Sequence, residues 1–132
     1  MDIGHANIGD IHLQWTEEDN LCLVNAWLNV PIDFVIGNEN TARDFWNQVA
    51  EEYNSNTADN RRRQPIQIKR RWSKMSSEIL LFDGMWRRVD DAFTATGQYN
   101  QDLVSKSLEM YRLEQNQSFK FLNMWMFIRN YP

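Results

Sequence analysis

The stretch IKRRWSKMSSEILLFDGMWRRVDDAF, from Ile68 to Phe93, decides the fold, because its large apolar residues recur at alternating steps of four and three residues. This spacing places them on one face of an α-helix, which has about 3.6 residues per turn. The face consists of Ile68, Trp72, Met75, Ile79, Phe82, Trp86, Val89 and Phe93. We therefore predict a long helix from near Pro65, which passes Gly84 either as one helix or as a kinked pair.

The segments on both sides of this stretch also carry helical patterns. Thr16 precedes three acidic residues and an apolar face, so it predicts the cap of a helix that ends before Pro31. A second helix follows from about residue 40, one from about residue 100 to 116, and a last one behind a cap at Ser118. No stretch reads as a strand. The predicted fold class is all-α.

Length and composition favour one folded domain. The chain has 132 residues, of which 42% are hydrophobic, enough to offset the entropy of ordering a core. Residues 1–14 show no helical pattern, so we expect a flexible N-terminal arm followed by a domain over residues 15–132. Cys22 is the single cysteine, and no apolar run reaches about 18 residues. We expect a reducing intracellular compartment and no membrane contact.

Charge is spread unevenly along the chain. Residues 1–60 contain eleven acidic residues and one basic residue, Arg43, whereas residues 61–132 contain thirteen basic and seven acidic residues. The segment NRRRQPIQIKRRWSKMSS, Asn60 to Ser77, holds seven Lys or Arg residues and no acid. Unpaired cations on a helix repel one another until an external anion neutralises them, so this segment predicts a polyanionic partner. A solvated surface and a nuclear-import signal remain alternatives.

The predicted helix places part of this basic segment opposite its apolar face. At about 100° per residue, Arg70, Lys74 and Ser77 lie opposite Trp72, with Gln67 and Ser73 beside them. We predict that double-stranded DNA binds here, because Arg reads guanine edges and both basic types hold phosphates. The predicted contacts to bases or backbone are Arg61, Arg62, Arg63, Gln67, Lys69, Arg70, Arg71, Ser73, Lys74 and Ser77.

Three motifs resemble the Myb/SANT family of three-helix domains: WTEED at Trp15, FWNQVAEEYN at Phe45 and IKRRW at Ile68. Trp15, Trp46 and Trp72 match the aromatic core anchors of that family. The wide gaps between them are similar to those of the plant trihelix branch, although RQPIQIKRR departs from the small polar stretch usual there. Downstream, LLFDGMW, ATGQYNQDLVSKSLEMY and FKFLNMWMFIRNYP resemble plant Myb/SANT-like proteins related to the accessory protein of PIF/Harbinger transposons.

The resemblance implies a three-helix unit with a long third helix and additional C-terminal helices. It also implies DNA binding through the third helix, location in the nucleus, and association with a transposase-like partner. A SANT-type module that binds chromatin proteins is the alternative. The C-terminal residues Met124, Trp125, Met126 and Phe127 either pack against the third helix or dock such a partner.

Catalytic and metal-binding patterns are missing from the sequence. His5, His12 and Cys22 do not have the spacing of a zinc site, so we expect no metal. Acidic pairs such as Glu51 and Glu52 are adjacent and do not face each other across a cleft. With no phosphate loop, dinucleotide fingerprint or activated nucleophile, we expect no cofactor and no enzymatic activity.

Overall fold

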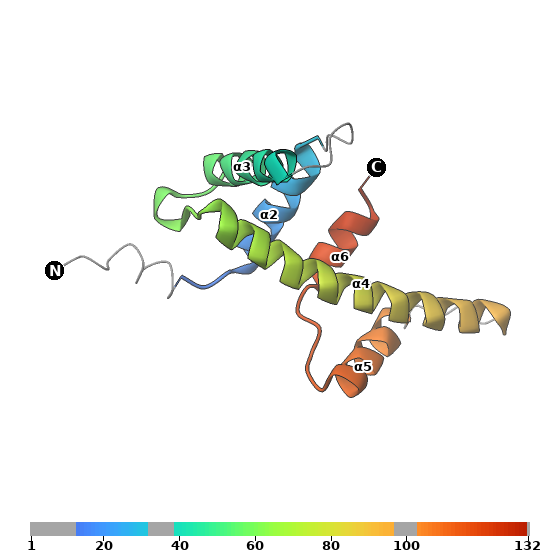
Figure 1. The fold of residues 1–132 in the computed structure, drawn as a ribbon. Helices are drawn as coiled ribbons and strands as arrows, with labels where there is room; N and C mark the ends of the chain where they lie inside the picture. The colour runs from blue at the N-terminus through green and yellow to red at the C-terminus, as the bar shows by residue number, and fades with distance from the viewer. Residues whose placement is uncertain (1–12, 32–38, 97–102, 132) are drawn as a thin grey trace. The chain divides into compact units, whose positions relative to one another are not determined.

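The computed structural model of this chain describes residues 13–31, 39–96 and 103–131. Within these residues the chain forms five α-helices and one short 3-10 helix, and it forms no strand. The helices are α2 (Glu17–Asn29), α3 (Glu39–Ser55), η1 (3-10, Asp59–Arg61), α4 (Pro65–Ala95), α5 (Leu103–Gln115) and α6 (Leu122–Arg129) (Figure 1). The all-α prediction is therefore confirmed for the described part of the chain.

The chain divides into two compact units, residues 1–72 and 73–132, and the boundary falls inside α4. The first unit contains α2, α3, η1 and the start of α4. The second contains the rest of α4, α5 and α6. That residues 15–132 form a single domain stays a prediction.

Helix α2 begins at the predicted cap. The Thr16 hydroxyl accepts a hydrogen bond from the Asp19 amide, and the Asp19 carboxylate accepts one from the Thr16 amide, each at 3.1 Å. This reciprocal capping box satisfies two amides that the first helical turn leaves without a partner. The helix ends at Asn29, before Pro31, as predicted.

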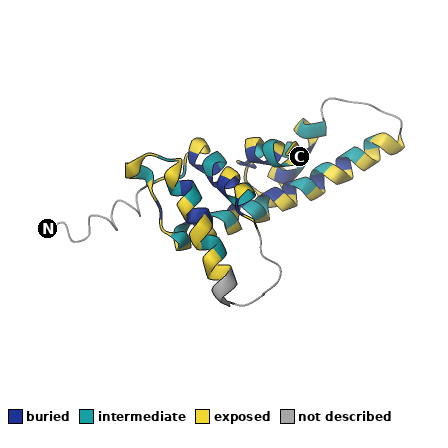
Figure 2. Cartoon of the chain, turned by 90° about the horizontal axis from the view of Figure 1, so that it is seen from above, coloured by how far each residue is buried: buried dark blue, intermediate teal, exposed yellow. Residues whose placement is uncertain are grey.

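The core of the first unit is built from α2, α3 and α4. Its fully buried side chains are Leu23, Val24, Val49, Tyr53 and Ile68, all at 0% exposure. Figure 2 shows buried and exposed residues alternating along the helices, as expected for amphipathic elements. One helical face from each of the three segments therefore supplies this core.

The three predicted tryptophan anchors lie at the edge of that core, because each is only half-buried. Trp15 contacts Tyr53 with ring centres 5.6 Å apart, and Trp46 contacts the neighbouring Phe45 at 5.2 Å. Trp72 stacks on Trp27 at 4.5 Å and an angle of 15°. The aliphatic residues and Tyr53 fill the centre, and the indoles cover it.

The second unit is organised around Phe82 on α4. Its ring stacks on Phe119 at 4.3 Å and meets Trp125 edge to face at 5.0 Å. Of the predicted apolar face of α4, Met75, Ile79, Phe82 and Val89 are buried here, whereas Trp86 and Phe93 are only half-buried. Met85, which the pattern did not include, is buried as well. Met124 and Trp125 are also buried, which favours packing within the chain over docking for that stretch, whereas Met126 stays 38% exposed.

Two details of the helices refine or correct the prediction. Helix α4 passes Gly84 without interruption and is one helix. The last helix begins at Leu122 behind Phe121, so the predicted cap at Ser118 is wrong. Residues 1–12 of the predicted arm and the start expected near residue 100 lie outside the described residues.

Candidate nucleic-acid interface

Arg63 is a structural residue of the first unit. Its side chain is buried, and its guanidinium lies 3.9 Å from the centre of the Trp15 ring. Its Nη2 lies 3.4 Å from Asp19 Oδ2, and its Nη1 and Nη2 donate to the carbonyl oxygens of Leu13 and Gln14 at 3.3 and 3.1 Å. The prediction that Arg63 contacts DNA is therefore wrong, because its donors are used inside the unit.

Arg61 is engaged by the same carboxylate. Its Nε donates to Asp19 Oδ1 at 3.0 Å, while its Nη2 bonds Asp19 Oδ2 and the carbonyl oxygen of Gln14. Burial alone would raise the pKa of Asp19, but hydrogen bonds from Arg61 and Thr16 outweigh burial and lower the pKa below 3.8. The pair is ionised at neutral pH, and its bonds to Asp19 and Gln14 occupy part of the Arg61 guanidinium, while a contact of Arg61 with phosphate stays a prediction.

The carbonyl groups of Leu13 and Gln14 thus belong to the folded unit, although sequence alone placed them in the arm. Both arginines hold this segment beside the start of α2. Of the three consecutive arginines, Arg61 and Arg63 therefore hold the N-terminal segment, and only Arg62 is exposed.

Arg71 and Gln67 also have partners inside the unit. Arg71 Nε donates to Asn20 Oδ1 at 3.0 Å, and its guanidinium lies 5.5 Å from the Trp15 ring centre. Gln67 Oε1 accepts a hydrogen bond from the Gln64 amide at 2.7 Å, which closes the start of α4. Each is half-buried and supports the fold, and a contact of either residue with DNA stays a prediction.

Lys69 and Arg70 remain as the open cations of α4 in the first unit. Both are exposed, and neither forms an ion pair within the described residues. They follow Ile68, which is fully buried, so the helix turns them away from the core. Arg62, just before the helix, is exposed in the same way.

Ser73, Lys74 and Ser77 belong to the second unit, and all three are exposed. Lys74 Nζ lies 2.8 Å from Glu78 Oε2, one helical turn later. The basic segment is free of acids over residues 60–77, but Glu78 directly beyond it supplies a carboxylate. An exposed i,i+4 pair of this kind stabilises by only about 0.3–0.5 kcal/mol, so an external phosphate competes with it readily.

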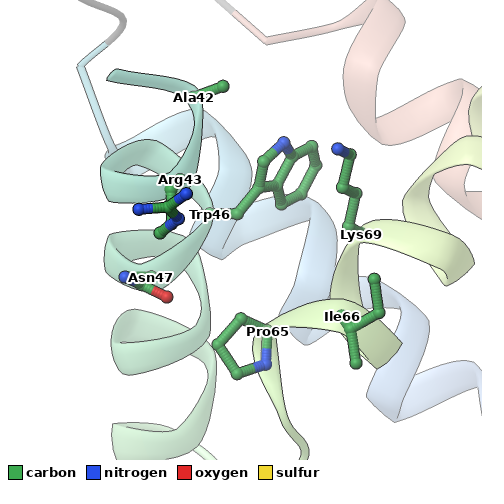
Figure 3. Close-up of a pocket in the computed structure, with 7 residues that line it drawn as sticks. All are labelled: Ala42, Arg43, Trp46, Asn47, Pro65, Ile66 and Lys69. Carbon is green, nitrogen blue, oxygen red and sulfur yellow. The ribbon is translucent and has the colours of Figure 1, made fainter. Parts of the chain in front are cut away.

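A groove of about 460 Å³ separates α3 from the first turns of α4 (Figure 3). Helix α3 contributes an alanine, an arginine, a tryptophan and an asparagine to its lining, and α4 contributes two apolar side chains and a lysine. Its lining residues are Ala42, Arg43, Trp46, Asn47, Pro65, Ile66 and Lys69. Ile66 is 52% exposed, which is unusual for a large apolar side chain of this unit.

Sequence reasoning missed the α3 side of this groove. Arg43 is the only basic residue among residues 1–60, and Trp46 and Asn47 follow it at the i+3 and i+4 positions of one helical face. That spacing, beside the one basic residue of residues 1–60, was the available signal. Assigning Trp46 only to the core concealed it.

The described residues offer little for other chemistry. Among them no three His, Cys, Asp or Glu side chains gather into a metal site, and no helix is long and apolar enough to span a membrane. The half-buried thiol of Cys22 lies 3.6 Å from the carbonyl oxygen of Tyr53. Burial and the charge of Asp19 raise the pKa of this thiol, which disfavours the reactive thiolate.

Comparison with known proteins adds one similarity. No protein-family model matches the chain, and no solved structure matches it. A protein of Arabidopsis thaliana described as glutathione S-transferase T3 is 26% identical over 121 residues. The match covers 89% of this chain and 20% of that protein, so the chain spans a fifth of its relative's length.

Proposed function

We propose that the first unit binds double-stranded DNA through the N-terminal turns of α4. The observation that supports this most is the pair of exposed cations, Lys69 and Arg70, which have no carboxylate partner within the described residues. Their helix is anchored from the other side by Ile68, at 0% exposure. A rigid helix with an open cationic face suits the major groove, which admits an α-helix and displays base edges.

The groove between α3 and α4 extends the proposed interface. Asn47 on α3 would contact the backbone, while the first turns of α4 approach the bases. In helix-turn-helix proteins the second helix enters the major groove and the first crosses the backbone. The Myb/SANT-like three-helix arrangement, with α2, α3 and α4 as its helices, belongs to this proposal, and so does a location in the nucleus.

We propose binding rather than catalysis as the activity of this chain. The transferase named among the comparisons is a protein of which the chain spans 20%, so its name describes a much longer molecule. A direct check is an assay of glutathione conjugation to an electrophilic model substrate. Turnover at an enzymatic rate would overturn the proposal that the chain is not an enzyme.

Titration of duplex DNA at several salt concentrations tests the proposed function. Each neutralised phosphate contributes about −0.9 to the slope of log affinity against log salt. Contacts from Arg62, Lys69 and Arg70 would therefore give a slope of about −3. Binding without any dependence on salt would contradict a phosphate-contacting surface.

The variant Lys69→Ala with Arg70→Ala removes two of these contacts. We expect the slope to become shallower, from about −3 to about −1, and binding to weaken by about 1–3 kcal/mol. Lys120→Ala is the matched control, because Lys120 is an exposed lysine of the second unit. Equal losses in both variants would show that binding is not localised on α4.

A protein-interaction module is the second candidate, and exposed leucines of the second unit favour it. Leu80 on α4 is 71% exposed and Leu113 on α5 is 66% exposed. Such residues suit a chromatin protein or a transposase-like partner. Sedimentation of the chain measures this: concentration-dependent self-association that Leu80→Ser abolishes would support the interaction module.

A further inference from the structure

Ile66 is the one large apolar side chain that is exposed among the described residues of the first unit. It lies in the first turn of α4, directly after Pro65, and is one of the residues that line the groove between α3 and α4 (Figure 3). Contact with water is unfavourable for the apolar surface of this isoleucine, which is 52% exposed. The side chain is therefore available to an apolar partner.

Two cations lie one helical turn after Ile66 on the helix surface. Lys69 and Arg70 are its i+3 and i+4 neighbours, which lie next to it on an α-helix. Both are exposed and have no ion pair in the described part of the chain. Contacts from both cations to phosphates of one strand would bring Ile66, one helical turn away, close to the adjacent groove.

The major groove presents one apolar feature to such a side chain, which is the C5-methyl group of thymine. A methylated cytosine presents the same group at the same ring position. Polar base edges would leave their donors and acceptors facing a hydrocarbon, which is unfavourable. In helix-turn-helix proteins the N-terminal residues of the recognition helix contact the base edges, and Ile66 occupies that part of α4.

We infer that Ile66 reads the C5-methyl group of a pyrimidine and so sets a sequence preference of the DNA site. This rests on the proposed function and adds a base identity to it. Lys69 and Arg70 supply affinity, whereas Ile66 distinguishes methylated from unmethylated pyrimidine. The apolar contact explains why an exposed isoleucine lies beside two open cations.

Atomic substitution in the DNA tests the inference. A duplex selected from a random pool is resynthesised with uracil in place of thymine, one position at a time, which removes only the methyl group. We expect one position at which affinity falls about fourfold, the value for losing burial of one methyl-sized group. A parallel series with 5-methylcytosine in place of cytosine shows whether that base is accepted at the same position.

Variants of Ile66 are then tested on the thymine and uracil duplexes. Ile66→Ala should bind thymine and uracil duplexes equally, while Ile66→Val should retain part of the preference. Leu113→Ala is the matched control, since it truncates an exposed leucine of the second unit. It should leave the preference for thymine over uracil, about fourfold, unchanged. Circular dichroism checks that each variant keeps the helical content.

The outcomes separate the inference from the proposed function. Salt-dependent binding with no sensitive thymine or methylcytosine position, or with a sensitivity that persists in Ile66→Ala, overturns the methyl contact and leaves DNA binding intact. Loss of discrimination in Ile66→Ala alone supports it. Absence of salt-dependent binding to any duplex removes the proposed function and the inference together.

Discussion

Asp19 connects three parts of the first unit through a single carboxylate. It accepts the Thr16 amide at the start of α2, it pairs with Arg61 at the end of η1, and it lies 3.4 Å from buried Arg63. The two arginines in turn hold the carbonyl groups of Leu13 and Gln14. A buried acid between two cations fixes where these segments meet.

Replacing Asp19 by Ala should destabilise the protein strongly. Asp19 and Arg63 side chains are 4% and 2% exposed, so the substitution leaves a buried guanidinium without its counter-charge. We expect a loss of about 3 kcal/mol in the free energy of unfolding, measured by denaturant titration. Asp59→Ala, at an exposed acid of η1, should change stability by less than about 0.5 kcal/mol. Similar losses in both would contradict a buried ion pair.

The same carboxylate predicts how stability depends on pH. Its pKa is lowered in the folded state from the ordinary value of 3.8, so the unfolded chain binds a proton more readily. The stabilisation is present above pH 3.8 and is lost as pH falls through the lower native pKa. Thermal unfolding across the acidic range should show a shallower dependence in Asp19→Asn than in the natural chain. Parallel curves would contradict this.

Arg63 and Arg70 show what sequence could not decide. Both lie in one basic segment, yet one is buried and the other exposed. The partners of Arg63 are 44 and 50 residues away, at Asp19 and Leu13. Helical spacing predicted the exposure of Arg70 because that depends only on its own helix, whereas the role of Arg63 depends on tertiary contacts that no local pattern contains.

At the level of elements, local signals account for what was predicted well. The cap of α2 at Thr16 and the apolar face of α4 are encoded within a few turns; the structure confirms the cap and buries most of that face. The start of α6 is not encoded in this way, since Phe121 precedes the helix without a side-chain cap. Phe119 and Phe121 are instead buried around the Phe82 cluster, and this packing holds residues 118–121 outside the helix.

Gly84 offers a test of the continuity of α4. It is exposed within the helix, and no atom lies within 4 Å of the point that the Cβ of an alanine would occupy there. Gly84→Ala should therefore raise the free energy of unfolding by about 0.5–1 kcal/mol, because alanine restricts the unfolded chain and favours the helix. Gly84→Ser should fall between the two. Destabilisation by alanine would show that the helix bends here.

Asn116 ends α5 in a left-handed conformation, with φ at 58°. Glycine adopts this conformation without strain, and asparagine tolerates it better than alanine. We expect Asn116→Ala to cost about 1 kcal/mol in stability and Asn116→Gly to be neutral or stabilising. Chemical unfolding of the two variants gives the comparison, and the reverse order would exclude a left-handed helix end.

For the whole molecule, the net charge of −4 conceals a division between acidic and basic parts. Within the first unit, exposed Glu17 and Glu18 lie on α2, whereas exposed Lys69 and Arg70 lie on α4. Under the proposed function, a DNA duplex would be repelled by one helix and attracted by the other, so the field would orient the protein before contact. Salt screens this long-range electrostatic interaction, with a Debye length of about 10 Å at about 0.1 M.

Glu18→Gln should therefore accelerate DNA association without altering which sequence is preferred. Removing an exposed charge that makes no base contact should raise the association rate by about twofold at low salt, and the gain should vanish as salt screens the field. Asn25→Asp adds a charge at an exposed position of the same helix and should have the opposite effect. Stopped-flow association measures both variants. Equal rates at low salt would mean that the acidic helix does not influence the approach of DNA, and a changed sequence preference would place α2 in contact with the bases.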